Sequence, residues 1–172
     1  MKKRAIETKW ALIFFVAGLL WMVLERSTGL HGEHISQHYI YTNLFAIPAI
    51  LIYVMALRDK RKNYYGGYIT FRRAFTSGAI ITVILMVLSP VSQLIVHYLI
   101  TPDYFQNISE YAVSQGEMTR PEAENYFNIA TYIMQSIIFT AAIGLLTSAI
   151  VSFFIKRTKK TGQASVGANA SL

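Results

Sequence analysis

Charged residues are absent from four long stretches of this chain: Trp10–Leu24, Tyr39–Leu57, Ala74–Ile100 and Ala130–Ile155. A bilayer core about 30 Å thick is crossed by roughly 20 apolar residues of helix. Such a segment must be helical in lipid, because no water is present to satisfy open backbone groups. We therefore predict an all-α integral membrane bundle of four transmembrane helices. The expected spans are about residues 8–26, 39–57, 72–100 and 126–155.

The first stretch has two interpretations. Lys2, Lys3 and Arg4 precede a short apolar run, which is also the plan of a signal peptide. No Ala-x-Ala-like cleavage site follows Leu24. Trp10 and Trp21 stand near opposite ends of the run, as interface anchors do. We favour a retained helix, with a cleaved signal peptide as the alternative.

Lysine and arginine gather in alternate connections between the stretches. Of the 16 lysines and arginines, 14 fall in the N-terminal segment, the loop 58–73 or the C-terminal segment. The remaining two, Arg26 and Arg120, lie in the other connections, together with seven of the nine acidic residues. The positive-inside rule then predicts cytoplasmic termini. The net charge of +7 thus reflects topology and does not indicate a nucleic-acid partner. The absence of cysteine excludes a disulfide scaffold.

The longest connection is expected to form an extracytoplasmic helical hairpin between the third and fourth spans. Residues 103–115 fit one helix, ended by Gly116. Thr119 and Glu122 form a capping-box pattern, so a second helix should begin there and run through Asn128 into the fourth span. Residues 1–157 would form one domain, and 158–172, rich in Gly, Ala and Ser, would be disordered.

A basic loop joins the second and third spans. Its cations are Arg58, Lys60, Arg61, Lys62, Arg72 and Arg73. The simpler interpretation is a positive-inside turn whose aromatic residues lie among lipid headgroups. The alternative is binding of anionic lipid. Membrane lipids are the expected partners in both cases.

Small residues recur every four positions in the fourth span: Ser136, Thr140, Gly144, Ser148 and Ser152. Ala74, Gly78 and Thr82 form a shorter ridge in the third span. Such ridges let helix backbones approach closely in lipid. They fit packing within one chain as well as a homo-oligomer or a membrane-protein partner.

Four histidines form a candidate metal site on the side opposite the termini: His31, His34, His38 and His97. The spacing of the first three places them on one face if the segment is helical. His34 and His38 could then share a zinc ion, with Glu33 and Asp103 as candidate carboxylate ligands. Ordinary surface histidines are the alternative, and no other cofactor is expected.

Four further polar residues map to the same half of the spans: Glu25, Asn43, Gln93 and Gln135. Polar groups at membrane depth usually face the bundle interior and pair with one another. We expect an interhelical hydrogen-bond cluster, with a polar pocket for an ion, a proton or a small ligand as the alternative.

Catalytic signatures are missing from the sequence. There is no nucleophile elbow, phosphate-binding loop or nucleotide fingerprint, and Ile35 stands where the zinc-protease pattern needs a glutamate. We therefore expect no enzyme. The first hypothesis is a non-enzymatic structural or partner-binding membrane component. The alternative is a small transport or sensing module for a metal ion or proton, using the histidines and polar residues.

Three stretches carry a resemblance to a known family: Tyr65–Phe71, with its Tyr-Gly-Gly-Tyr start, Ala74–Gly78 and Ile100–Phe105. The segment Gly29–His34, with His38, is similar to one subgroup of that family. The segment Met118–Glu124 and the span after it are also similar. In the order of these stretches the chain resembles a family of small four-helix bacterial membrane proteins, frequent in Bacteroidetes and known only as a domain of unknown function. The resemblance implies a multi-pass membrane protein in a bacterial inner membrane and assigns no catalytic residue.

Overall fold

The computed structural model describes residues 4–158. Its helices are α1 (Ala5–Ser27), η1 (Ile35–Gln37), α2 (His38–Tyr41), η2 (Thr42–Phe45), α3 (Ala46–Asp59), η3 (Lys60–Tyr64), α4 (Phe71–Ile95), η4 (Val96–Ile100), α5 (Tyr104–Ser114), α6 (Arg120–Tyr126) and α7 (Ile129–Ile155). The η3 and η4 segments are π-helical turns that extend α3 and α4. The tail predicted to be disordered lies, apart from Thr158, outside the described residues.

Four helical stretches are long and apolar enough to cross a membrane, which confirms the predicted all-α class. They are Ala5–Ser27, Ile35–Tyr64, Phe71–Ile100 and Ile129–Ile155. Large apolar side chains cover their outer surfaces: Leu20, Val87 and Phe154 are 64%, 71% and 78% exposed. A surface of this kind suits lipid, whereas water-soluble monomers rarely expose apolar patches of such extent.

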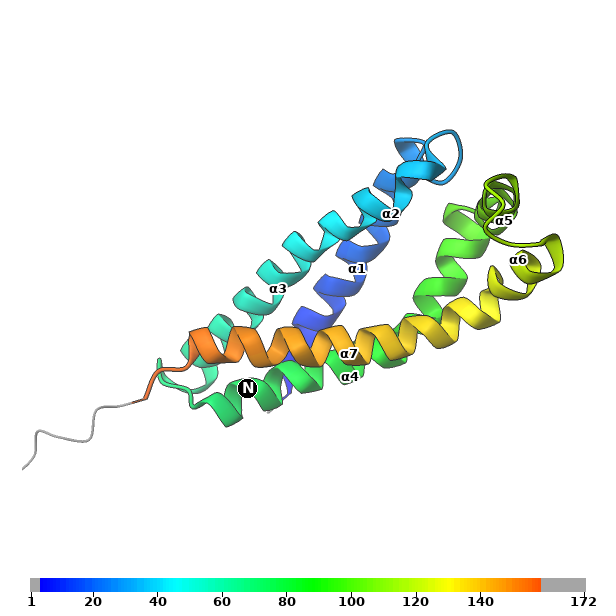
Figure 1. Cartoon of the computed structure of the whole chain (residues 1–172). Helices are drawn as coiled ribbons and strands as arrows, with labels where there is room; N and C mark the ends of the chain where they lie inside the picture. The colour runs from blue at the N-terminus through cyan, green and yellow to red at the C-terminus, as the bar shows by residue number, and fades with distance from the viewer. Residues whose placement is uncertain (1–3, 159–172) are drawn as a thin grey trace, which may run out of the picture.

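In Figure 1, α1 and α3 run antiparallel to each other, as do α4 and α7; we call these the two pairs, and they are joined by contacts of α1 with α4 and of α3 with α7. We call the end of the bundle that holds Arg4 and Arg157 the terminal end, and the opposite end, which holds α5 and α6, the hairpin end. The ribbons of the two pairs lie closest at the terminal end and separate toward the hairpin end (Figure 1). Ile69 and Arg157 exchange two backbone hydrogen bonds at the terminal end, tying the basic loop to the end of α7.

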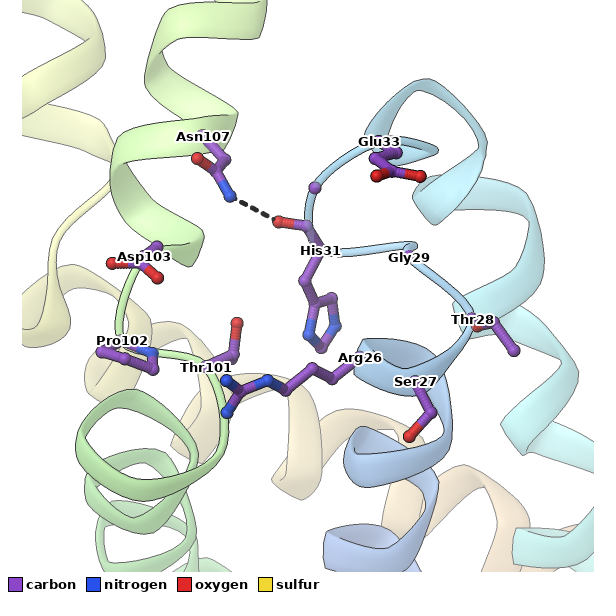
Figure 2. Close-up of a pocket in the computed structure, with 11 residues that line it drawn as sticks. Arg26, Ser27, Thr28, Gly29, His31, Glu33, Thr101, Pro102, Asp103 and Asn107 are labelled. Carbon is purple, nitrogen blue, oxygen red and sulfur yellow. Dashed lines mark hydrogen bonds between the residues drawn. The ribbon is translucent and has the colours of Figure 1, made fainter.

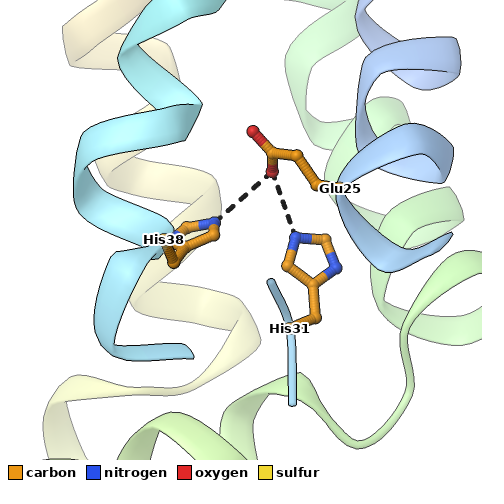
Figure 3. Close-up of side chains that lie close together, drawn as sticks. All are labelled: Glu25, His31 and His38. Carbon is orange, nitrogen blue, oxygen red and sulfur yellow. Dashed lines mark hydrogen bonds and ion pairs between the residues drawn. The ribbon is translucent and has the colours of Figure 1, made fainter. Parts of the chain in front are cut away.

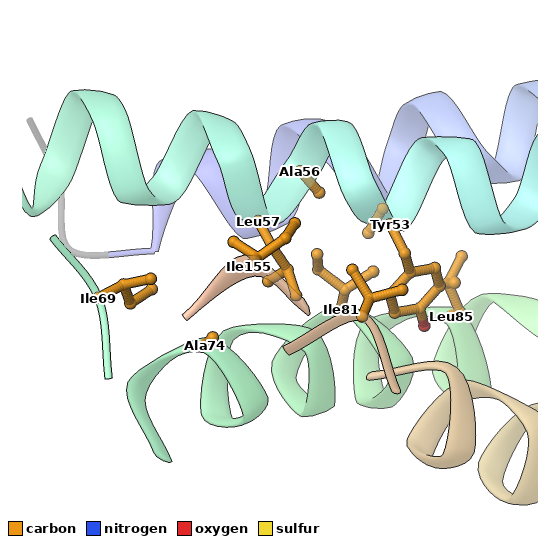
Figure 4. Close-up of a cluster of buried hydrophobic side chains, with 10 residues drawn as sticks. Tyr53, Ala56, Leu57, Ile69, Ala74, Ile81, Leu85 and Ile155 are labelled. Atoms are coloured by element: carbon orange, nitrogen blue, oxygen red, sulfur yellow. The ribbon is translucent and has the colours of Figure 1, made fainter. Parts of the chain in front are cut away.

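The buried apolar cluster lies where the pairs are closest. Leu57 of α3, Ile81 of α4 and Ile155 of α7 meet there, together with Ile69 of the basic loop (Figure 4). The hydroxyl groups of Tyr53 and Thr82 lie 2.8 Å apart at the edge of this cluster, so the buried phenol keeps a hydrogen-bond partner.

The small-residue ridges pack against each other within the chain. A Cβ added to Gly78 of α4 would lie 2.6 Å from Ser148 Oγ of α7, and one added to Gly144 of α7 would lie 2.6 Å from Thr82 Cγ2. These two glycines therefore permit the close approach of α4 and α7. The part of the ridges around them is used inside one subunit.

The predicted helical hairpin between the third and fourth spans is present as α5 and α6. Gly116 ends the first helix with a φ of 71°, and the Thr119–Glu122 capping box starts the second. One expectation was wrong: the second helix does not run into the fourth span. It ends at Tyr126, and α7 begins anew after Asn128, whose side-chain oxygen accepts a hydrogen bond from the Thr131 amide at 3.0 Å. Asparagine is a strong N-cap, so a new helix starts there.

Candidate metal centre

A tight loop after α1 determines the position of the first histidine. Gly29 has a φ of 77°, and the Leu30 amide donates to the Glu25 carbonyl at 3.0 Å, so the chain folds back over the end of α1. His31 is thereby buried, with 4% of its surface exposed. Asn107 of α5 donates to the His31 carbonyl at 2.8 Å and joins the loop to the hairpin (Figure 2).

Three side chains from different elements meet under this loop. Glu25 comes from the last turns of α1, His31 from the loop and His38 from the start of α2 (Figure 3). His31 Nε2 donates to Glu25 Oε2 at 3.1 Å, and His38 Nε2 lies 3.4 Å from the same oxygen. One ligand atom from each residue lies within 4.8 Å of the other two.

The centre is shielded by aromatic side chains. Trp21 Nε1 donates to the second carboxylate oxygen, Glu25 Oε1, at 2.6 Å and holds the carboxylate in place. The Tyr104 ring packs 5.1 Å from the His31 ring and 5.4 Å from the His38 ring, measured between centroids. Burial raises the pKa of Tyr104, and the nearby Tyr132 and Glu25 raise it further, so the phenol stays neutral.

Two imidazole nitrogens at the centre are buried without a hydrogen-bond partner among the described residues. They are His31 Nδ1 and His38 Nε2, the second of which faces the Glu25 carboxylate. Buried polar atoms are usually hydrogen-bonded, and His38 Nε2 makes only a long contact of 3.4 Å with the carboxylate that it faces. A bound cation between His38 and Glu25 would give this nitrogen a partner.

Two of the three separations between ligand atoms fit a tetrahedral transition-metal site, and the third is within 4.8 Å. Zinc bonds of about 2.0 to 2.1 Å place neighbouring ligand atoms about 3.3 Å apart at the tetrahedral angle. The two distances from Glu25 Oε2, 3.1 Å and 3.4 Å, bracket that separation. Two imidazoles and one carboxylate form a three-ligand set that leaves the fourth position for water or another exchangeable ligand.

Cavities adjoin the centre on several sides. One, of about 470 Å³, is lined by His31, Arg26, Glu33, Asp103 and Asn107 among others (Figure 2). Glu33 and Asp103 place two exposed carboxylates beside it. A second cavity, of about 300 Å³, reaches Glu25, and a third, of about 100 Å³, reaches His38. Water and small ions therefore have space to approach each of the three side chains.

The structure brings together only two of the four predicted metal ligands. His31 and His38 meet, but not on one helical face, because residues 28–34 form turns and the helix begins at Ile35. His34 is exposed and lies against Gly29, so it does not share a site with His38. His97 packs against Tyr98 and Phe105 and lines the small cavity beyond His38.

The four polar residues do not form a common pocket. Gln93 lines the small cavity with His38 and His97. Asn43 is exposed and donates to the Tyr39 carbonyl of its own helix at 2.5 Å, and Gln135 is exposed on α7. Glu25 instead belongs with the histidines. Glu25 was not predicted as a metal ligand from the sequence. Its carboxylate, at the end of a span and six residues before His31, was the feature that could have indicated this role.

The six cations of the basic loop take different positions. Lys60 is buried, with Nζ 2.8 Å from Glu7 Oε1 of α1, and Arg61 donates to the Ile155 carbonyl at 3.0 Å. Arg72 and Arg73 line a cavity at the terminal end. Arg58 and Lys62 are exposed on the surface, away from that cavity.

Comparison with known proteins identifies a family. Searches of the curated proteins and of the solved structures find no match. A family model described as "Protein of unknown function (DUF4199)" matches residues 9–157, from the first turns of α1 to the end of the described bundle. The chain, with four helices suited to crossing a membrane, is therefore a multi-pass membrane protein that belongs to the DUF4199 family.

Proposed function

We propose that this protein is a non-enzymatic membrane module that binds a divalent transition-metal ion, with zinc as the best candidate, at its hairpin end. The observation that carries the proposal is the meeting of buried Glu25 and His31 with half-buried His38, with ligand atoms within 4.8 Å of one another. Imidazole with carboxylate suits zinc and its neighbours, whereas calcium and magnesium prefer oxygen ligands alone.

A sensing or transport role fits this ligand set better than a permanent structural metal. Structural zinc sites are closed by four protein ligands, whereas three ligands leave a position through which the ion can exchange. The surface around the centre would also attract cations. Six acidic residues at the hairpin end are exposed: Glu33, Asp103, Glu110, Glu117, Glu122 and Glu124.

We further propose that the hairpin end faces outward from a bacterial inner membrane and that the termini are cytoplasmic. The supporting observation is the segregation of charge, because the terminal end holds most of the cations and only Glu7 and Asp59 as carboxylates. The metal site would then sample the extracytoplasmic space. Single cysteines introduced into this cysteine-free chain at Gly66 and Met118 should react with an impermeant thiol reagent from opposite sides; labelling from the same side would overturn the orientation.

A partner-binding role was the first expectation from the small-residue ridges. Gly78 and Gly144 are occupied by contacts between α4 and α7, so this part of the ridges gives no support to an oligomer. The metal-binding proposal is therefore the better supported of the two.

The test is a zinc competition assay on the full chain in mild detergent against a chromophoric chelator. The variants are Glu25→Gln, which keeps the shape of the side chain, and His38→Ala. The matched controls are His34→Ala and His97→Ala, which remove imidazoles near the centre but outside the ligand set. Loss of a ligand should weaken zinc binding by about a hundredfold, whereas the controls should stay within about threefold of the unmodified protein.

Cobalt(II) gives an independent readout of geometry. The unmodified protein should give the intense visible absorption of tetrahedral cobalt, and Glu25→Gln should lose it. Equal zinc affinity in Glu25→Gln and His34→Ala would refute the proposal and leave the centre as a buried ion pair. Zinc binding that is absent from the unmodified protein would refute it as well.

A further inference from the structure

A second polar centre lies at the terminal end, remote from the histidines. A cavity of about 300 Å³ opens between the start of α1, the π-helical turn η3 and the first turns of α4. Its lining contains four cations and one carboxylate: Arg4, Lys60, Arg72, Arg73 and Glu7. Tyr64, Tyr65 and Thr76 add hydroxyl groups.

The inner wall of the cavity is a buried ion pair. Glu7 and Lys60 are 2% and 3% exposed, and Lys60 Nζ lies 2.8 Å and 3.0 Å from the two carboxylate oxygens. Ser77 donates to Glu7 Oε1 at 2.9 Å. Both oxygens of Glu7 are thus engaged, by Lys60 of η3 and Ser77 of α4, and this carboxylate neutralises Lys60.

The outer wall is positive and uncompensated. Among the described carboxylates, none lies within ion-pair distance of Arg4, Arg72 or Arg73. Asp59, the other carboxylate of this end, is paired with Lys9 and accepts hydrogen bonds from Trp10 and Asn63. Arg73 stacks on the Tyr65 ring, with its guanidinium carbon 5.2 Å from the centroid, which fixes its orientation beside the cavity.

An apolar stripe continues from the cavity along α4. Thr76, Ile80, Val83 and Val87 follow at spacings of four, three and four, so they share one face of the helix. Thr76 and Ile80 line the cavity, and Val83 and Val87 are 56% and 71% exposed beyond it. A molecule with an anionic head and an apolar tail could place its head in the cavity and its tail along this stripe.

We propose that this cavity binds a phosphate group through Arg4, Arg72 and Arg73. Guanidinium groups form bidentate, charge-assisted hydrogen bonds with phosphate oxygens. The positive-inside rule requires only that cations lie on the cytoplasmic side, whereas here three guanidinium groups gather at the mouth of one cavity. The phosphate belongs to a lipid headgroup or to a free anion, and the apolar stripe favours the lipid. The site is independent of the proposed metal centre, so either proposal stands if the other fails.

The test counts lipids bound to the full chain in neutral detergent by native mass spectrometry. Phosphatidic acid is the probe, phosphatidylcholine is the comparison without net charge, and inorganic phosphate is added as competitor. The variant Arg72→Gln/Arg73→Gln removes two cavity cations. The matched control Arg58→Gln/Lys62→Gln removes two exposed cations of the same loop outside the cavity.

The cavity variant should bind phosphatidic acid about tenfold more weakly or worse, and the control should stay within about twofold of the unmodified protein. Thr76→Phe, which fills the cavity without changing charge, should weaken binding in the same way. Displacement of the lipid by inorganic phosphate would assign the site to the phosphate group alone, and failure to displace it would assign the site to the lipid. Equal losses in the cavity and control variants, or equal binding of phosphatidylcholine, would overturn the proposal.

Discussion

The contact between α4 and α7 gives the sharpest test of the fold, through the change Gly78→Ala. The added Cβ would lie 2.6 Å from Ser148 Oγ, 2.7 Å from Ser148 Cβ and 3.3 Å from Ser148 Cα. Rotating the serine side chain relieves only the first of these contacts, because Cα belongs to the α7 backbone and the position of Cβ is fixed by it. The two helices must therefore move apart.

The size of the effect follows from two opposing terms. Forcing an extra methyl into a close-packed contact costs about 1 to 3 kcal/mol, and a contact with backbone belongs in the upper half of that range. Alanine in place of glycine in a helix returns about 1 kcal/mol. Gly78→Ala should thus lower the free energy of unfolding by about 1 to 2 kcal/mol. The matched control is Gly18→Ala in α1, whose added Cβ meets nothing closer than Phe45 Cζ at 3.8 Å and should be neutral or stabilising.

The assay is unfolding in mixed micelles of rising SDS content, followed by tryptophan fluorescence. The comparison of the two alanine variants cancels the helix-propensity term and isolates the packing term, expected at about 2 to 3 kcal/mol. If Gly78→Ala proves as stable as Gly18→Ala, the close approach of α4 and α7 is refuted, and the small-residue ridges must be sought in another contact.

Two further predictions concern the charged groups. Glu7→Ala and Lys60→Ala should each lower the free energy of unfolding by about 3 to 5 kcal/mol, because each leaves a buried charge without its ion-pair partner. The double variant Glu7→Leu/Lys60→Met should lower it much less. Equal losses in the single and double variants, measured by the same unfolding assay, would show that the pair is not buried as described. At the start of α6, hydrogen bonds from Thr119 lower the pKa of Glu122, so the cap stabilises the helix at pH values above the ordinary glutamate pKa and is lost as pH falls through the lowered one. A Thr119→Gly variant keeps the amide donor and loses the hydroxyl donor, so an NMR titration should show the Glu122 pKa rising only part of the way to its ordinary value; no rise would contradict the role of the hydroxyl in the capping box.

Most of the secondary structure was predictable from short stretches of sequence. A helix in lipid needs only an unbroken apolar run, so the spans follow from the placement of charges. Gly116 and the pair Thr119 and Glu122 set the hairpin by local backbone chemistry. The error at Phe127–Asn128 arose because a polar residue between two helical patterns fits both a continuing helix and a new N-cap.

The composition of the candidate site was less predictable. Spacing suggested that His34 would join His38, but the turn at Gly29 carries His31 inward and leaves His34 exposed. Helical spacing places residues on one face only when they belong to one continuous helix, whereas here the turns at residues 28–34 precede the helix that contains His38. Glu25 was visible as a buried polar residue, yet its partners depend on how α1 is rotated against α2.

The sequence by itself thus determined that the chain is a four-helix membrane protein with opposite charge at its two ends, because the cost of placing charge in lipid acts on each residue independently of its neighbours in space. Only the tertiary structure decided which charged and polar side chains meet. Glu7 pairs with Lys60, 53 positions away, because helix rotation and a π-helical turn bring the two side chains together. Glu25 contacts His31 and His38 because helix rotation and a tight loop place both imidazoles beside it. Those relations are set by packing between helices, which no local pattern encodes.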